Sequence, residues 1–372
     1  MKTSLLTLII IMLMQVSCVL ETLAYSSQKW IHPTSDNIPN VTNPDFILRP
    51  LNDVLTVGPD FYSSLAIIDT VIIGVDEGEP YEMLGNIFDI EVDVDGRIFI
   101  LDREFGEVLF YDPDGSYLGS FGGPGVGPGE FTEPGELALS ESGRIAVVFE
   151  ERIHVFERQE NGQFLYRNSF PAVGSRGCAM NDHIYVSDYH PGRPGNIQKF
   201  TMEGEWVASF GYTYRSESEF VTSVMSSGAS ARLACSERHG IIGMALSRIP
   251  ILDGYSEDGE LLWRIKFEDL KSSPIEEHNG GRKLIYKKSS KGDGVLAYFF
   301  TDADGEFFNI THFINAGRGK PTPWHYYRVD VRTGDGQYTG NARFLRATHR
   351  DYVIQSLEYP YPTLRVFHLD GN

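Results

Sequence analysis

Residues 89–122 read Asp89-Ile-Glu-Val-Asp-Val-Asp-Gly96-Arg-Ile-Phe-Ile-Leu-Asp102, then Arg103-Glu-Phe-Gly-Glu-Val-Leu-Phe-Tyr-Asp112-Pro-Asp-Gly115, then Ser116-Tyr-Leu-Gly-Ser-Phe-Gly122. The stretch contains four short runs of β-branched and aromatic residues, which favour strands. Asp-Gly, Glu-Phe-Gly and Asp-Pro-Asp-Gly separate these runs and are typical of tight turns. The stretch therefore predicts a four-stranded antiparallel meander.

Similar blocks follow along the chain. The turn glycine Gly115 recurs as Gly162, Gly204 and Gly259, at intervals of 47, 42 and 55 residues. Two less regular copies span about residues 283–340 and 342–371. A β-repeat of this period is typical of the blades of a β-propeller.

The two ends of this array complement each other. The last copy offers only three strands, whereas residues 65–74 form an apolar run that has no partners of its own. A strand from this run would complete the last blade and remove its exposed edge. We therefore predict an all-β protein, a six-bladed β-propeller of four-stranded antiparallel blades, closed by an N-terminal strand that completes the last blade.

The N-terminus has the pattern of a targeting segment. Lys2 precedes an apolar run from Leu5 to Met14, which is too short to span a bilayer comfortably. We predict a signal peptide over residues 1–24. The alternative is a lipoprotein signal that ends before Cys18, which would then carry a lipid anchor. Both alternatives predict an exported protein without a transmembrane span in its mature form, located in the periplasm, attached to the outer membrane or extracellular.

Residues 25–64 are rich in Pro, Ser, Thr and Asn, which predicts a linker or surface strap before a propeller over residues 65–372. Of the 372 residues, 32 are Lys or Arg and 51 are Asp or Glu, so the formal net charge is −19. This acidity argues against a nucleic-acid partner, because phosphate contacts need a basic surface. The 23 Phe and 19 Tyr supply ample core, which excludes a disordered chain.

The connection between the first two copies carries a family resemblance. Phe121-Gly-Gly-Pro-Gly-Val-Gly-Pro-Gly-Glu-Phe131, followed by Glu133-Pro134, looks like the link between blades in NHL-repeat propellers. The chain resembles the secreted, six-bladed, NHL-like propellers of bacteria over about residues 65–371. The resemblance implies a central channel but no single activity, because this scaffold hosts binders, lyases and lactonases.

Charged residues recur where the inner strands should begin. Counting nine residues back from the first Ile of each second strand gives Asp89, Glu136, Ser175 and Arg232, which could ring one mouth of the channel. The loops between second and third strands should reach the same side. The candidate ligand-binding residues are Asp89, Glu136, Arg176, Arg232, Asp102 and His190. Opposed carboxylates and guanidiniums could grip a polar ligand, or they could form an ion network between blades.

The sequence contains only weak signals for a metal site. Glu91, Asp93, Asp95 and Asp102 mimic the spacing of a calcium loop, but the alternating Val residues and the absence of flanking helices favour a hairpin turn. No two His have the spacing of a zinc motif. We therefore predict no metal site and no cofactor, with calcium or another divalent cation left open.

Cys178 and Cys235 occupy matching inner-strand positions of neighbouring blades. Such positions should lie beyond the roughly 7 Å Cα separation that a disulfide permits, so two buried free thiols are expected. A bridge is the alternative, because export permits one.

Two functions remain in competition. The first is an exported binding scaffold for a protein, peptide or glycan, which the lack of a recognisable catalytic constellation favours. The second is a metal-dependent lyase or lactonase at the channel mouth, in which carboxylates would hold the metal and a His or carboxylate would move protons.

Overall fold

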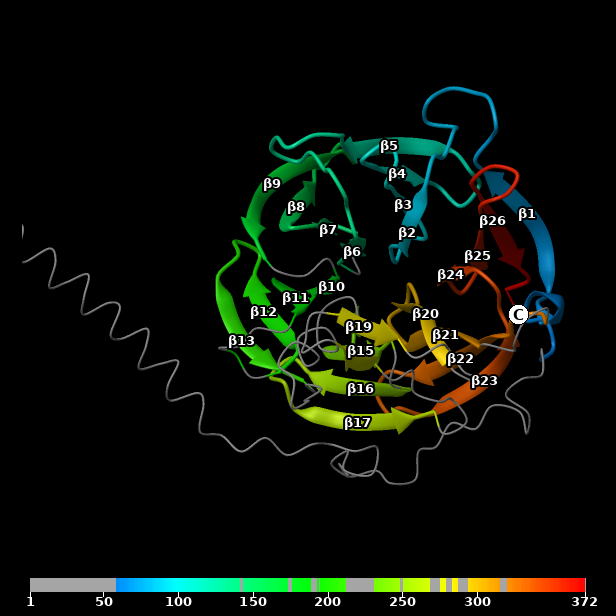
Figure 1. The fold of residues 1–372 in the computed structure, drawn as a ribbon. Helices are drawn as coiled ribbons and strands as arrows, with labels where there is room; N and C mark the ends of the chain where they lie inside the picture. Colours follow the sequence, from blue (N-terminus) through cyan, green and yellow to red (C-terminus); the bar gives the residue numbers. More distant parts are fainter. Residues whose placement is uncertain are drawn as a thin grey trace, which may run out of the picture.

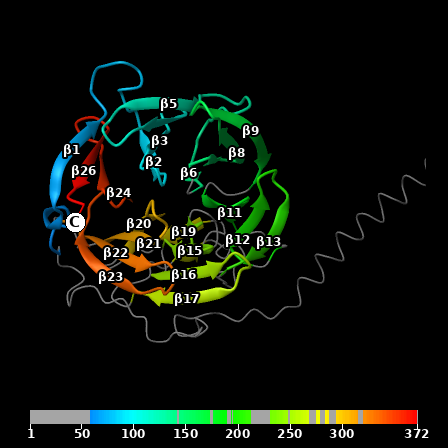
Figure 2. The same cartoon turned by 180° about the vertical axis from the view of Figure 1, so that it is seen from behind.

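The structure, a computed structural model, describes residues 58–371 except residues 141–142, 173–175, 189–192, 194, 212–230, 248–249, 268–274, 279–282, 287–293 and 315–319. Six four-stranded antiparallel sheets surround a central axis (Figure 1), and the ring is equally clear from behind (Figure 2). The predicted six-bladed propeller is therefore confirmed. The predicted signal peptide, Cys18 and most of the linker lie outside the described residues.

Each blade runs from an inner strand at the axis to an outer strand at the rim. Blade 1 contains β2 (Ile87–Val92), β3 (Ile98–Asp102), β4 (Glu107–Tyr111) and β5 (Tyr117–Gly122). Blade 2 contains β6 (Glu136–Leu139), β7 (Ile145–Phe149), β8 (Arg152–Arg158) and β9 (Phe164–Pro171). Blade 3 contains β10 (Gly177–Met180), β11 (His183–Ser187), β12 (Ile197–Thr201) and β13 (Trp206–Phe210).

The remaining blades follow the same order. Blade 4 contains β14 (Ala231–Ser236), β15 (Ile241–Leu246), β16 (Ile251–Ser256) and β17 (Leu261–Lys266). Blade 5 contains β20 (Gly294–Thr301), β21 (Phe307–Ile314), β22 (Trp324–Asp330) and β23 (Gly336–Asn341). Blade 6 contains β24 (Leu345–Thr348), β25 (Tyr352–Leu357), β26 (Thr363–Leu369) and β1 (Ile67–Ile73). β18 (Ile275–His278) and β19 (Lys283–Tyr286) pair antiparallel in a separate two-stranded sheet, so the fifth blade begins later than residue 283.

The first and last segments of the propeller meet in blade 6. β1 pairs antiparallel with β26, with Val71 opposite Val366 and Ile73 opposite Leu364. Figure 1 shows β1 at the rim beside β26. Ile73 is 4% exposed and packs in the core between blades 6 and 1. The N-terminal strand therefore closes the ring as its sequence predicted.

The described end of the predicted linker is packed against the propeller. It contains one turn of 3₁₀ helix, Tyr62–Ser64. The ring of Phe61 lies 5.0 Å from that of Tyr326 in blade 5, and the Tyr62 hydroxyl donates to the carbonyl of Arg343 at 2.9 Å. This short segment therefore acts as a strap across blades 5 and 6.

The core lies between blades. Between blades 1 and 2, Phe99 and Phe110 pack against Ala146 and Val148, and the other blade interfaces contain equivalent apolar clusters. A fully buried apolar side chain contributes ~1.5–3 kcal/mol. All five residues of β3 are buried, because a neighbouring blade covers each face of the sheet. This explains why the second strands read as continuous apolar runs.

Every outer strand contains one residue that the ladder skips. These residues are Leu118, Arg167, Val207, Leu262, Thr339 and Ile68, in blades 1 to 6. A bulge of this kind bends and twists an edge strand, which hinders its pairing with another chain. The rim is thereby protected although it carries exposed apolar side chains. Within the described residues, no helix is long and apolar enough to cross a membrane.

Candidate functional site at the channel mouth

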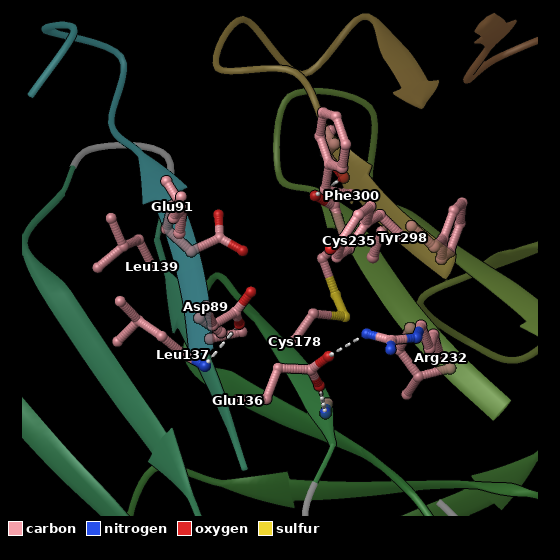
Figure 3. A pocket seen from close by; sticks show the side chains of 18 of the residues that line it. Asp89, Glu91, Glu136, Leu137, Leu139, Cys178, Arg232, Cys235, Tyr298 and Phe300 are labelled. Carbon is pink, nitrogen blue, oxygen red and sulfur yellow. Dashed lines mark hydrogen bonds and ion pairs between the residues drawn. A yellow bond between two sulfur atoms is a disulfide. The ribbon is translucent and has the colours of Figure 1, made fainter. Parts of the chain in front are cut away.

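The inner strands enclose a small cavity on the axis (Figure 3). Its volume is about 50 Å³, which holds a few water molecules. Asp89, Glu136 and Arg232 all line it. The register argument therefore brought residues from blades 1, 2 and 4 to one place, but the space between them is too small for an organic ligand.

Asp89 links three blades. One oxygen of its carboxylate accepts a hydrogen bond from the backbone N–H of Leu137 in blade 2, at 2.9 Å. The other oxygen lies 3.6 Å from a guanidinium nitrogen of Arg346 in blade 6. Charge-assisted contacts of this kind hold the inner strands of blades 6, 1 and 2 together at the axis.

Glu136 links blades 2, 3 and 4 in the same way. It accepts a hydrogen bond from the backbone N–H of Gly177 in blade 3 at 2.5 Å, and its other oxygen lies 3.7 Å from Arg176 and 3.9 Å from Arg232. Burial nevertheless outweighs these contacts and raises the pKa of Glu136 to about 7. Burial together with the nearby charge of Arg176 lowers the pKa of Arg232 to about 10. The ionised pair is therefore costly to bury.

Two charged residues of the axial cavity were missed by the register count. Glu91 follows Asp89 on β2 and lines the cavity, where burial and the charges of Asp89 and Glu136 raise its pKa well above the usual range. Arg346 stacks over Tyr298 at 4.5 Å and donates to the carbonyl of Phe88 at 2.6 Å. The pairing of β24 shifts beside Arg346, and such an irregularity re-aims a side chain in a way that counting residues cannot follow.

Cys178 and Cys235 form a disulfide, so the expectation of two free thiols was wrong. Their Cα atoms are 5.7 Å apart, and the bridge joins β10 to β14 beside the axial cavity (Figure 3). The inner strands converge toward the axis, and both cysteines face the interface between blades 3 and 4. The alternative that export allows is therefore the one observed.

The other residues that we predicted at the channel mouth do not line the axial cavity within the described part of the chain. Asp102 is fully buried, and its carboxylate accepts backbone hydrogen bonds from Gly85, Asn86, Glu104 and Phe105. It therefore fixes a turn and must be removed from the predicted ligand-binding set. His190 and Ser175 lie outside the described residues.

The residues that mimic a calcium loop do not converge. Asp93 and Asp95 both pair with Arg97, at 3.1 and 2.8 Å, and the N–H of Gly96 donates to the carbonyl of Asp93 in a tight turn. Glu91 faces the axial cavity instead. The hairpin interpretation is confirmed. Across the described ranges, no three His, Cys, Asp or Glu residues form a group that could hold a metal ion.

A much larger space lies at the mouth between blades 1 and 2. We call it the blade 1/2 cleft; its volume is about 430 Å³, and it is lined by Phe88, Arg103, Thr132, Glu133, Gly135, Glu150, Glu151 and Arg176. This volume is in the range of ligand pockets. Arg176, one of the predicted mouth residues, faces it, as does Arg103 from the loop after β3.

Glu150 supports one wall of this cleft. One of its oxygens accepts hydrogen bonds from the backbone N–H of Thr132 at 2.8 Å, from the Thr132 hydroxyl and from the N–H of Glu133 at 2.5 Å. The other lies 3.7 Å from His154. Burial acts to raise the pKa of Glu150, but these hydrogen bonds lower it below its usual value. This carboxylate is therefore ionised and already committed to the wall.

A second, adjoining space lies between blades 2 and 3. This blade 2/3 cleft has a volume of about 240 Å³ and is lined by Glu151, Pro171, Ala172, Asp188, Arg193, Gln198 and Phe200. Arg193 stacks over Trp206 at 4.7 Å. Glu151 lines both clefts, so they adjoin on one face of the propeller.

Comparison with known proteins agrees with this architecture. Residues 82–202 match a family, DUF5128, described as a 6-bladed beta-propeller. No curated protein sequence matches the chain. A "putative exported protein" of Bacteroides fragilis has a similar structure, with a TM-score of 0.53 and 10% identity over 82% of this chain and 96% of that one. A member of the duf4221 family from Bacteroides vulgatus gives a TM-score of 0.52 and 10% identity, over 82% and 97% of the two chains.

Identities this low show the fold alone. The family match covers the first two blades and part of the third, which is also where the sequence repeats are most regular. The chain is a six-bladed β-propeller, similar in its first blades to the DUF5128 family and in overall structure to these two proteins of Bacteroides.

Proposed function

We propose that this protein is an exported, NHL-like binding scaffold, and that its protein, peptide or glycan ligand sits in the blade 1/2 cleft. The observation that carries the proposal is the contrast between the two spaces at the mouth. The axial cavity has a volume of about 50 Å³ and its carboxylates Asp89 and Glu136 lie close to guanidiniums, whereas the cleft has a volume of about 430 Å³.

The axial ring supports a structural role for the charges that the sequence placed there. Asp89 and Glu136 each bridge three blades, so moving either to hold a metal or substrate would break contacts that join the inner strands. This leaves the lyase or lactonase alternative without a supporting group of residues in the described part of the chain. The NHL-like connection at residues 121–134 and the signal pattern at residues 1–24 support the family relationship and export.

The test is a binding screen with two matched variants. The mature chain is screened against random synthetic peptides and a glycan array, and every hit is measured again with a cleft variant, Phe88→Ala with Arg103→Gln. The control is Arg144→Gln, which removes an exposed arginine that pairs with Glu157 outside both clefts. Hits that weaken only in the cleft variant support the proposal.

A parallel measurement addresses the enzyme alternative. Metal analysis of the purified protein and its thermal midpoint with and without a chelator are expected to show no stoichiometric divalent cation and no shift. A bound cation whose removal lowers the midpoint, together with an absence of binding hits, would overturn the scaffold proposal.

A further inference from the structure

We infer that the ligand is a peptide segment with one carboxylate, which Arg103 and Arg176 bind in the blade 1/2 cleft, and with an apolar side chain that enters the blade 2/3 cleft. The inference rests on the proposed function and names the ligand class of that same site. It starts from two arginines whose hydrogen-bonding capacity is largely unused.

The guanidinium of Arg176 has N–H donors that are available for a ligand. Its side chain is 21% exposed, and its nearest carboxylate oxygen, on Glu136, is 3.7 Å away, which is too long for a hydrogen bond. It donates no hydrogen bond to any residue in the described part of the chain. A guanidinium has five N–H donors in a planar fork that fits a carboxylate.

Arg103 is the second donor. It lies 4.6 Å above the ring of Phe88, and its one hydrogen bond to a side chain is a long contact of 3.4 Å to Glu133. The side chain of Glu133 is 82% exposed, so this pair contributes little. Stacking on Phe88 restrains the guanidinium, which reduces the entropy cost of binding an anion, and the side chain lines the cleft with 34% of its surface exposed.

The acidic residues of the cleft do not cancel this pair of charges. Glu150 is bound by three donors of its own wall. Glu151 is exposed and lies where the two clefts adjoin, a position from which it can accept an N–H of an extended peptide. The two sites together therefore match a carboxylate, a backbone donor and an apolar group.

The aromatic residue of the cleft favours a peptide over a glycan. Sugar rings pack their C–H faces on open aromatic faces. Phe88 packs against the apolar cluster between blades 1 and 2, and the guanidinium of Arg103 covers a face of its ring at 4.6 Å. The apolar contacts come instead from Pro171, Ala172 and Phe200 in the blade 2/3 cleft, which suit an aliphatic or aromatic side chain.

The net charge limits how acidic the peptide can be. At −19 the protein repels polyanions at long range, so recognition depends on one carboxylate held at short range. A peptide with a single carboxylate is therefore expected to bind more tightly than one with three.

The experiment uses the mature chain and synthetic peptides that combine one Asp or Glu with an apolar residue at varied spacing, each made as a free acid and as a C-terminal amide. Changing Asp or Glu to Asn or Gln tests a side-chain carboxylate, and amidation tests a terminal one. Loss of the recognised carboxylate, or Arg176→Gln, is expected to weaken binding about tenfold or more. Ala172→Glu should abolish the preference for an apolar neighbour, and Arg144→Gln should change nothing.

The outcomes separate the two proposals. Peptides that bind with equal affinity as acid and as amide forms, yet weaken in the Phe88→Ala, Arg103→Gln variant, would overturn the carboxylate inference and leave the scaffold proposal standing. Glycan hits without peptide hits would do the same. No hit of either kind would overturn both. Thermal midpoints of all variants within about 2 °C of the parent confirm that lost binding is not lost folding.

Discussion

Removing the disulfide between Cys178 and Cys235 should destabilise the propeller by an amount that follows from its position in the chain. The bridge spans 57 residues and joins blades 3 and 4. Closing a loop of that length removes about 14 cal/mol/K of conformational entropy from the unfolded chain, or ~4 kcal/mol at 25 °C. The variant Cys178→Ala with Cys235→Ala removes the bridge and keeps a small apolar side chain at both positions of the apolar cluster between blades 3 and 4.

The assay is equilibrium unfolding in urea of the mature chain, the chain with a reductant, and the double-alanine variant. The free energy of unfolding should fall by ~4 kcal/mol on reduction and by a similar amount in the variant. Reductant should not change the variant. Alkylation of Cys178 and Cys235 in denatured, unreduced protein, or a reduced chain as stable as the oxidised one, would refute the reasoning.

Three further predictions concern buried groups. Ile73→Ala should lower the free energy of unfolding by ~3 kcal/mol in thermal unfolding, because Ile73 is 4% exposed and packs in the core between blades 6 and 1. Ile72→Ala on the same strand should lower it by under ~0.5 kcal/mol, because Ile72 is 53% exposed. Equal effects of the two substitutions would contradict the closure of the ring by β1. Glu136→Gln should become more favourable relative to the parent as pH rises from 5 to 8.5: burial raises the folded pKa from about 4.5 to about 7, so a stabilisation of ~2.5 kcal/mol that protonated Glu136 gives the parent at pH 5 is lost over that window, and parallel pH profiles of parent and variant would refute this. Burial beside His325 and Phe267 lowers the pKa of His312 to about 3, so the parent should lose ~2 kcal/mol relative to a His312→Leu variant between pH 7.5 and 5, as the unfolded His binds a proton; equally steep profiles of parent and variant would show that His312 is not the cause.

The blades could be predicted from the sequence because their signals are local. Each turn glycine and each alternating run lies within a few residues of the strand it defines, so the sequence repeat predicts the blades of the structure directly. The role of residues 67–73 followed from a missing strand in the last copy. The start of the fifth blade was predicted less well, since β18 and β19 pair with each other in a separate two-stranded sheet and the first strand of the blade begins at Gly294.

The site depends on distances between blades, which the sequence does not contain. Register placed Asp89, Glu136 and Arg232 at the axis, but Arg346 escaped because the pairing of its strand is irregular. The same convergence of inner strands that brought the cysteines within 5.7 Å also left the channel too small for a ligand. Asp102 shows a further limit of prediction from sequence, because an aspartate that fixes a turn and one that binds a ligand cannot be distinguished from the sequence alone.

The clefts had no sequence signal of their own. Arg103 and Arg176 are 73 positions apart, and they share one cleft because the loop after β3 and the entry to β10 reach the same face. Both guanidiniums have few hydrogen-bond partners within the described residues, and this can be seen only in a structure. Phe88 could have been suspected from its position beside Asp89, but its stacking with Arg103 could not.

The most direct test of the account is a crystal structure of the mature chain with a bound ligand from the peptide screen. We expect density for a carboxylate between the guanidiniums of Arg103 and Arg176, with an apolar side chain against Pro171 and Phe200 and an axial cavity that holds only water. Ligand density on the axis, beside Glu91 and Arg232, would contradict the account.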